Sequence, residues 1–187
     1  MATRPGFALF ETALGACAIA WSGSGIVGVQ LPEASESRSR ARIQRRFAGA
    51  REAAPPPEVQ HAIDSIVALL AGRRVDLSGL ALDIAAVPAF DRRVYAIARE
   101  IGPGATLTYG EVAARLGDAR LARDVGQALA RNPFAIVVPC HRVLAADGRL
   151  GGFSASGGPA TKQRLLAIEG ARVGAEPGLF DDLPAGG

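Results

Sequence analysis

The sequence predicts an α/β domain followed by a mostly α-helical domain. Short apolar runs separated by glycine fill residues 7–31, which is typical of an antiparallel sheet. Beyond residue 90, apolar residues recur at helical spacing instead. A change in composition at residues 83–88 separates the two patterns, so we expect domains at 1–85 and 86–172. The glycine- and proline-rich residues 173–187 are expected to form a disordered tail.

The N-terminal half is expected to begin with an antiparallel meander of three strands. Apolar runs bounded by turn residues place these strands at 7–12, 16–21 and 26–31. Residues 35–47 are rich in arginine and serine and fit either a helix or a loop, whose charges most often form a solvated face. Apolar residues at helical spacing then predict a helix over 58–71, which Gly72 ends.

The C-terminal half is expected to begin with two helices. Asp91 can cap a helix that runs to residue 101. Thr108 and Glu111 lie three residues apart at the start of the next helix, which is the spacing of a capping box, and Gly117 ends that helix.

A third helix is predicted after a very short turn that Asp118 opens. Its apolar face carries Leu121, Val125 and Leu129. Its opposite face carries arginine and glutamine at spacings of three and four, namely Arg120, Arg123, Gln127 and Arg131. Two helices joined by a tight turn, the second with such a stripe, form the pattern of a DNA-binding helix-turn-helix. An amphipathic hairpin with a solvated face is the more common source of this pattern, and both interpretations stay open.

Positive charge is concentrated in the C-terminal half. Nine arginines and five acidic residues lie between Arg92 and Arg149, a net charge of +4 in a chain whose total is +3. Such a region suggests a polyanionic partner. No apolar run approaches the ~18–20 residues of a membrane span, so we expect no membrane association.

The candidate for a reactive site is Cys140 with its neighbour His141. The apolar residues 136–138 predict a buried strand that Pro139 ends, and the two residues follow directly. A thiol beside a titratable base is a plausible nucleophilic pair, although a buried structural cysteine fits the same residues equally well. Neighbouring residues of a strand point to opposite faces, so this pair cooperates only if the chain turns there or a water molecule bridges it.

Glu169 is the second unusual position. A helix is predicted from Pro159 to residue 168, with Gly170 just beyond, so Glu169 falls in the last turn, where the helix dipole disfavours a carboxylate. A nearby cation would offset that cost, and His141 is a candidate, but simple surface placement is the more common explanation.

The two cysteines make neither a disulfide framework nor a metal site. Cys17 lies inside a predicted strand and is expected to be a core residue, and no cysteine or histidine cluster has zinc-ligand spacing. We therefore expect no metal and a reducing, cytoplasmic location.

Several of these motifs together resemble the O6-alkylguanine-DNA alkyltransferase family, also called methylated-DNA–protein-cysteine methyltransferases. The likeness extends from about residue 90 to 170 and rests most specifically on Pro139-Cys140-His141-Arg142-Val143. It also includes Thr108-Tyr109-Gly110-Glu111, Ala122-Arg123-Asp124-Val125-Gly126, Asn132-Pro133, Lys162 and Leu165-Leu166-Ala167-Ile168-Glu169-Gly170.

The resemblance implies a DNA-repair protein that acts once, without a cofactor and as a monomer. Its partner would be double-stranded DNA that contains O6-alkylguanine, with O4-alkylthymine as a further candidate, and the damaged nucleotide would be flipped out of the duplex. It implies that Cys140 accepts the alkyl group irreversibly, that His141 acts as a water-mediated base, and that Glu169 orients this base. It further implies a ribonuclease-H-like N-terminal domain and a winged-helix-like C-terminal domain.

The resemblance also implies roles for the residues around this triad. Asn132 would stiffen the segment before the site, Tyr109 would donate a proton or hydrogen bond to the leaving guanine, and Arg123 would fill the gap left by the flipped base. The remaining residues expected to contact DNA or substrate are Gly126, Gln127, Arg120, Arg142, Phe153, Ser154 and Lys162. The loop 153–158 is longer than in many members, which affects the expected preference among alkyl groups.

Two other functions are compatible with parts of the sequence. A cysteine hydrolase could use Cys140, His141 and Glu169, but it lacks an evident oxyanion-hole motif and leaves the helix-turn-helix unexplained. A non-enzymatic DNA-lesion binder of the same fold would have no need of Cys140.

Overall fold

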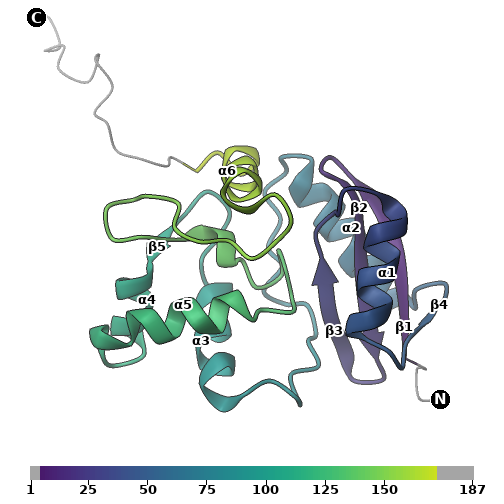
Figure 1. Ribbon diagram of the computed structural model, residues 1–187, viewed down its shortest axis with the longest axis horizontal. Helices are drawn as coiled ribbons and strands as arrows, with labels where there is room; N and C mark the ends of the chain where they lie inside the picture. The colour runs from purple at the N-terminus through teal and green to yellow at the C-terminus, as the bar shows by residue number, and fades with distance from the viewer. Residues whose placement is uncertain (1–4, 172–187) are drawn as a thin grey trace, which may run out of the picture.

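A four-stranded sheet forms the N-terminal part of the protein (Figure 1). The computed structural model describes residues 5–171, and the predicted tail at 173–187 lies outside them. Strands β1 (Gly6–Thr12), β2 (Gly15–Ser22) and β3 (Gly25–Gln30) are successive antiparallel neighbours, which confirms the predicted meander. Strand β4 (Arg51–Glu52) pairs in parallel with β1, so the sheet is mixed rather than purely antiparallel. Both β4 residues are exposed, which is why no apolar pattern marks this strand.

Two helices cover opposite faces of this sheet. Because side chains alternate along a strand, Phe7, Ala18 and Ala20 face α1 (Glu36–Arg46), where they form a small cluster with its Ile43. The other face belongs to the main core and packs on α2 (Pro57–Leu70). The arginine-rich residues 35–47 are thus a helix rather than a loop, and Ser35 caps it by accepting a hydrogen bond from the backbone of Arg38. Cys17 is completely buried, as predicted.

The C-terminal part is mostly helical, as predicted. Its elements are α3 (Ala89–Arg99), β5 (Leu107–Thr108), α4 (Tyr109–Arg115), the 3₁₀ turn η1 (Ala119–Leu121), α5 (Ala122–Ala130), the 3₁₀ turn η2 (Cys140–Arg142), β6 (Val143–Leu144) and α6 (Gly158–Ile168). The capping box at the start of α4 is present, with Thr108 and Glu111 each bonded to the other's backbone. Strands β5 and β6 form a short parallel ladder that holds the Cys140 turn beside α4.

The predicted cap of α3 is wrong. Pro88 is the N-cap residue and the helix begins at Ala89, so Asp91 is the third residue of the helix, in its first turn. Its buried carboxylate accepts hydrogen bonds from Arg131 at 2.9 and 3.1 Å and so links the start of α3 to the end of α5. Arg131 therefore stabilises the helix pair and is not a free member of the basic stripe on α5.

The predicted strand at residues 136–138 is also wrong, although the residues are buried as expected. They form a tight turn in which Ile136 adopts a left-handed φ of 73°, a strained conformation for a β-branched residue. Hydrogen bonds on both sides of Val29 hold the start of this turn: the Val29 amide donates to Pro133, and the Ala135 amide donates to the Val29 carbonyl. An apolar run indicates burial, but it does not distinguish a strand from a turn whose backbone bonds are made by another strand.

One hydrophobic core joins the two parts of the chain. A single cluster of buried side chains includes Ile19 of β2, Ile66 of α2, Val94 of α3 and Val125 of α5. The connecting residues 71–88 also pair with β3, since the Ile26 amide donates to Ala81 and the Asp83 amide donates back to Ile26. None of the helices described in residues 5–171 has the length and apolar composition needed to cross a membrane.

Candidate active site

Cys140 begins the short 3₁₀ turn η2, and Pro139 alone separates it from the buried turn at residues 136–138. Its amide donates to the Val138 carbonyl at 2.8 Å, and its side chain is only partly exposed. Because the chain turns here rather than continuing as a strand, Cys140 and His141 are not forced onto opposite faces of a sheet. The structure thereby meets the condition under which these neighbours can cooperate.

His141 is bound to the carboxylate that its position in the sequence suggested. The imidazole Nε2 lies 2.9 Å from Oε1 of Glu169, and both side chains are almost completely buried. Arg142 holds the same carboxylate through two hydrogen bonds of 2.8 Å, and its guanidinium also donates to the carbonyl of Ile101. A last-turn carboxylate that would be unfavourable on the surface is therefore stabilised by two buried donors.

The protonation states in this cluster follow from burial and charge. Burial alone would raise the pKa of Glu169, but hydrogen bonds from His141 and Arg142 outweigh it and lower that pKa to about 2. Burial lowers the pKa of His141, although its hydrogen bond to Glu169 opposes the shift. Since Glu169 is ionised, Nε2 carries the hydrogen, and Nδ1 keeps its lone pair. Nδ1 is buried and has no hydrogen-bond partner within the described residues, so it is the atom of His141 that can accept a proton.

The Cys140 thiol is neutral in the resting protein. Burial raises its pKa, while hydrogen bonding from Asn132 and the charge of Lys162 act in the opposite direction. A neutral thiol needs a base to become a nucleophile, because the thiolate is the reactive species. The neighbouring His141, whose pKa is lowered by burial, is the candidate for such a base.

Asn132 fixes the turn that presents Cys140. Its amide nitrogen donates to the Val138 carbonyl at 2.9 Å, and its carbonyl oxygen accepts from the Phe134 amide at 2.9 Å. These two bonds join Asn132 to both ends of the strained Ile136 turn; whether they stiffen the segment stays a prediction.

A cavity of about 760 Å³ opens in front of Cys140. Five of the residues expected to bind DNA or substrate line it together with the cysteine: Tyr109, Arg123, Gly126, Phe153 and Ser154. The side chain of Arg123 is exposed on the first turn of α5. Gly151, with a left-handed φ of 66°, lets the loop pass close to Tyr109: a Cβ there would lie 3.2 Å from the tyrosine ring. Burial raises the pKa of Tyr109, so its hydroxyl remains a donor near neutral pH.

The other expected contact residues do not reach this cavity. Arg142 and Lys162 are buried, which contradicts their expected contact with DNA or substrate. Lys162 instead donates to the Val143 carbonyl at 2.6 Å and lies over the Tyr109 ring, and burial lowers its pKa to about 8. Arg142 thus anchors η2 to Glu169 and Ile101, and Lys162 holds the residue that follows η2, Val143. Gln127 is exposed on α5, and Arg120 is exposed but ion-paired with Asp118 at 2.8 Å.

The sequence did not predict the link between Arg142 and Glu169. The signal was present, since an arginine directly after the candidate base was a possible partner for the badly placed carboxylate. Contact over 27 positions in the sequence is nevertheless decided by the fold. No group of three or more histidine, cysteine or acidic residues in the described part of the chain is arranged to hold a metal ion.

Comparison with known proteins places this site in a family. Residues 89–171 match the family model described as the DNA-binding domain of 6-O-methylguanine DNA methyltransferase. The methylated-DNA–protein-cysteine methyltransferase of Methanothermobacter thermautotrophicus is 37% identical over 152 residues, which cover 81% of this chain and 78% of the relative. The protein of that name from Mycobacterium tuberculosis is 39% identical over 126 residues, covering 67% and 74%.

Solved structures agree with these relatives over nearly the whole chain. The Mycobacterium tuberculosis O6-methylguanine methyltransferase superposes with a TM-score of 0.69 at 31% identity, covering 95% of this chain and 99% of that one. The same organism's enzyme in complex with DNA gives a TM-score of 0.68, also at 31% identity, covering 90% and 95%. Identity and coverage both extend well beyond the cysteine motif, and the chain belongs to the methylated-DNA–protein-cysteine methyltransferase family.

Proposed function

We propose that this protein repairs DNA by transferring an alkyl group from O6-alkylguanine in a duplex to the sulfur of Cys140. The observation that carries the proposal is the position of this thiol. It lies between a cavity large enough for a base and a buried His141–Glu169–Arg142 cluster that can take its proton. The names of the relatives supply the substrate class.

The transfer requires one proton to move from sulfur to guanine. The thiol proton passes through a bridging water to Nδ1 of His141, and Glu169 stabilises the resulting imidazolium. The thiolate attacks the alkyl carbon in line, the S–C bond forms, and the C–O6 electron pair leaves with guanine. Tyr109 donates a hydrogen bond or a proton to that guanine. The proton held by His141 then passes to guanine, or to Tyr109 where the tyrosine has given up its own, so that both end neutral. The product thioether has no easy leaving group, so each molecule acts once.

Access to Cys140 requires the damaged nucleotide to leave the helix stack. Arg123 and Gly126 lie on the side of α5 that borders the cavity, which suits a helix that lies against the duplex while the base passes beside it. Arg123 would occupy the space that the base vacates. Contacts of this kind to the minor groove and phosphates depend little on sequence and strongly on salt.

The proposal extends to several features of the whole molecule. The N-terminal part, 1–85, would be a ribonuclease-H-like domain and 86–172 a winged-helix-like domain with a helix-turn-helix at α4 and α5. The protein would act as a monomer in the cytoplasm. The loop at 153–158 borders Cys140, so it would influence which alkyl groups are accepted and whether O4-alkylthymine is a substrate.

A mass measurement on the modified protein tests the proposed transfer. Incubation with a duplex that contains O6-methylguanine should add the mass of one methyl group, located on the peptide that contains Cys140. The Cys140→Ala variant should remain unmodified and still bind the duplex. Unmodified native protein after prolonged incubation would refute the transfer, and release of product over many turnovers would indicate a hydrolase instead.

A further inference from the structure

A second cavity, of about 460 Å³, reaches Cys140 from the N-terminal domain. Cys140, Ala130, Phe153 and Ser154 line both cavities, so the two meet at the reactive sulfur. The far side of the second cavity is formed by three arginines of α1, namely Arg42, Arg45 and Arg46. The helix α1, which the proposed function does not use, therefore borders the approach to the active site.

The arginines of α1 form a continuous strip toward this cavity. Arg42 follows Arg38 by four positions, and the adjacent Arg45 and Arg46 follow Arg42 by three and four, which places all four along one side of the helix; we call them the α1 strip. A smaller hollow of about 400 Å³ is lined by Arg38, Arg42 and Arg45, so the strip also extends beyond the cavity that reaches Cys140.

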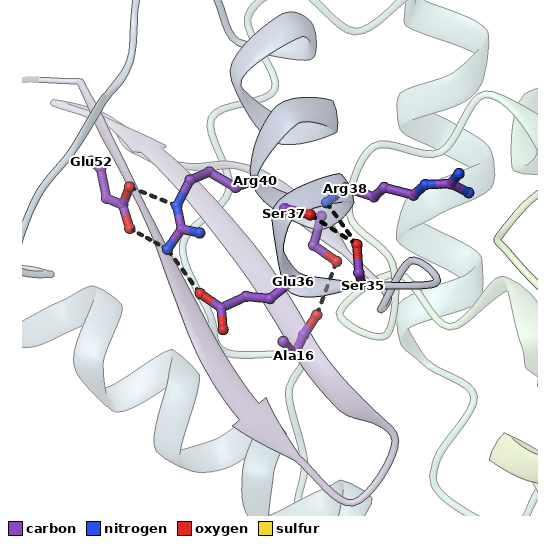
Figure 2. Close-up of polar contacts among 8 residues, drawn as sticks. Ala16, Ser35, Glu36, Ser37, Arg38, Arg40 and Glu52 are labelled. Carbon is purple, nitrogen blue, oxygen red and sulfur yellow. Dashed lines mark hydrogen bonds and ion pairs between the residues drawn. The ribbon is translucent and has the colours of Figure 1, made fainter.

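The positive charge of the α1 strip is largely uncompensated. Within residues 5–171 its only ion pair joins Arg42 to Glu33, so four arginines and one carboxylate leave a net charge of +3. Arg40, on another side of the same helix, is different: its guanidinium lies 2.9 Å from both Glu36 and Glu52. Figure 2 shows these two carboxylates around Arg40, while the Arg38 side chain extends away from them. Two carboxylates thus neutralise the single Arg40 on the side of α1 that faces β4, whereas one carboxylate, Glu33, faces the four arginines of the α1 strip.

We propose that the α1 strip binds phosphates of the DNA strand that delivers the damaged nucleotide to Cys140. Like charges at helical spacing are unfavourable in the free protein, and a phosphate backbone would relieve their repulsion. Arginine also matches the geometry of phosphate oxygens in two-bond contacts. The N-terminal domain would then contribute directly to DNA binding, although the recognition elements belong to the C-terminal part.

The distance along α5 from Arg123 towards the α1 strip suits a single bound DNA strand. Arg123 is on the first turn of α5, whereas Ala130 on its last turn lines the same cavity as the α1 strip. A helix of nine residues is about 13 Å long, which corresponds to roughly four phosphates of one strand. A strand held at Arg123 therefore needs about four phosphates to reach Ala130, at the edge of the cavity whose far side carries the α1 strip.

The inference rests on the proposed DNA substrate, but binding tests it without any alkyl transfer. The double variant Arg38→Gln/Arg45→Gln removes two exposed arginines of the strip that have no ion pair in the described structure. The matched control is Arg40→Gln/Arg51→Gln, which removes the same charge at the β4 edge. Fluorescence anisotropy with an undamaged fluorescent duplex, over a range of salt concentrations, gives the affinity and its salt dependence for both.

The strip variant should bind roughly tenfold more weakly than the native protein. Its slope of log affinity against log salt should decrease by up to about 1.8, or about 0.9 for each phosphate that is no longer neutralised. The control should keep a slope close to the native value. Both variants should react with free O6-benzylguanine at the native rate, which shows that the fold and the Cys140 site are intact.

Equal slopes for the strip variant and the native protein would overturn the inference, as would an equal decrease in the control. Failure of the native protein to accept an alkyl group would instead refute the proposed function, whatever the two slopes show.

Discussion

His141 and Glu169 are 28 positions apart in the chain, yet Nε2 of one lies 2.9 Å from Oε1 of the other in the protein interior. The pair is completed by Arg142, which binds both oxygens of the same carboxylate. Glu169 therefore does two things: it fixes the tautomer of His141, and it balances a buried guanidinium.

Replacing Glu169 should affect catalysis and stability together. Glu169→Gln leaves Arg142 buried without a counter-charge, which should lower the free energy of unfolding by about 3–5 kcal/mol. The single-turnover rate of methyl transfer should fall about 100-fold or more, because the imidazolium is no longer stabilised. Urea unfolding and quenched-flow kinetics measure the two effects.

His141→Gln is the matched control, because it keeps the Glu169–Arg142 ion pair. It should lose a similar factor in rate with a smaller loss of stability. A rate within twofold of the native protein in both variants would contradict the assignment of His141 as the base.

The stability of the protein should decrease in acid as Glu169 becomes protonated. Its pKa is lowered in the folded state from 4.5 to about 2, so the ionised form stabilises the fold above pH 4.5. That contribution, at most about 3 kcal/mol, is lost as the pH falls from about 4.5 towards 2. Urea unfolding at pH 7, 4.5 and 3 measures it, and Glu169→Gln should show a shallower decrease. Parallel curves for the two proteins would show that other carboxylates cause the acid dependence.

Removal of the Asn132 side chain should loosen the turn that presents Cys140. Asn132→Ala loses the bonds to Val138 and Phe134, which should cost about 1–3 kcal/mol of stability and slow transfer even to the free base. Asn132→Asp retains the acceptor for the Phe134 amide and should lose less stability. Thermal unfolding and the O6-benzylguanine reaction compare them with Gln163→Ala, an exposed position on α6. Native behaviour of Asn132→Ala would exclude a stiffening role.

Loss of the Arg123 side chain should affect duplex DNA selectively. Arg123→Ala leaves the cysteine cluster untouched, so its reaction with free O6-benzylguanine should remain native. Repair of O6-methylguanine in a duplex should slow about tenfold or more, because the vacated position in the stack is no longer filled and unstacking costs a few kcal/mol. Equal losses on both substrates, measured as single-turnover rates, would contradict the base-flipping role.

The sequence by itself determined the three strands of the meander, the arginine-bearing helix α5 and the capping box, because period-2 and helical apolar patterns and caps are local properties; it left residues 35–47 open as a helix or a loop. It also identified Cys140 and His141 as neighbours and Glu169 as a carboxylate in need of a partner. Local patterns failed where distant backbone bonds decide the conformation. Residues 136–138 are a turn rather than a strand: Val29 of β3 bonds the backbone just before them, at Pro133 and Ala135, and the Val138 amide folds back to the Phe134 carbonyl.

Only the tertiary structure decided which charged residues are buried and with whom. Arg142 and Lys162 are positively charged, as DNA-contacting residues often are. In the interior, however, Arg142 binds the carboxylate of Glu169, and Lys162 binds the carbonyl of Val143. The arginines of α1 have the pattern of a solvated face, yet the packing of α1 on the sheet places Arg42, Arg45 and Arg46 beside a cavity that reaches Cys140. A charged residue looks the same in the local sequence pattern whether it is buried or exposed. Its surroundings depend on segments far away in the chain, and these surroundings determine whether it positions a base or meets a phosphate.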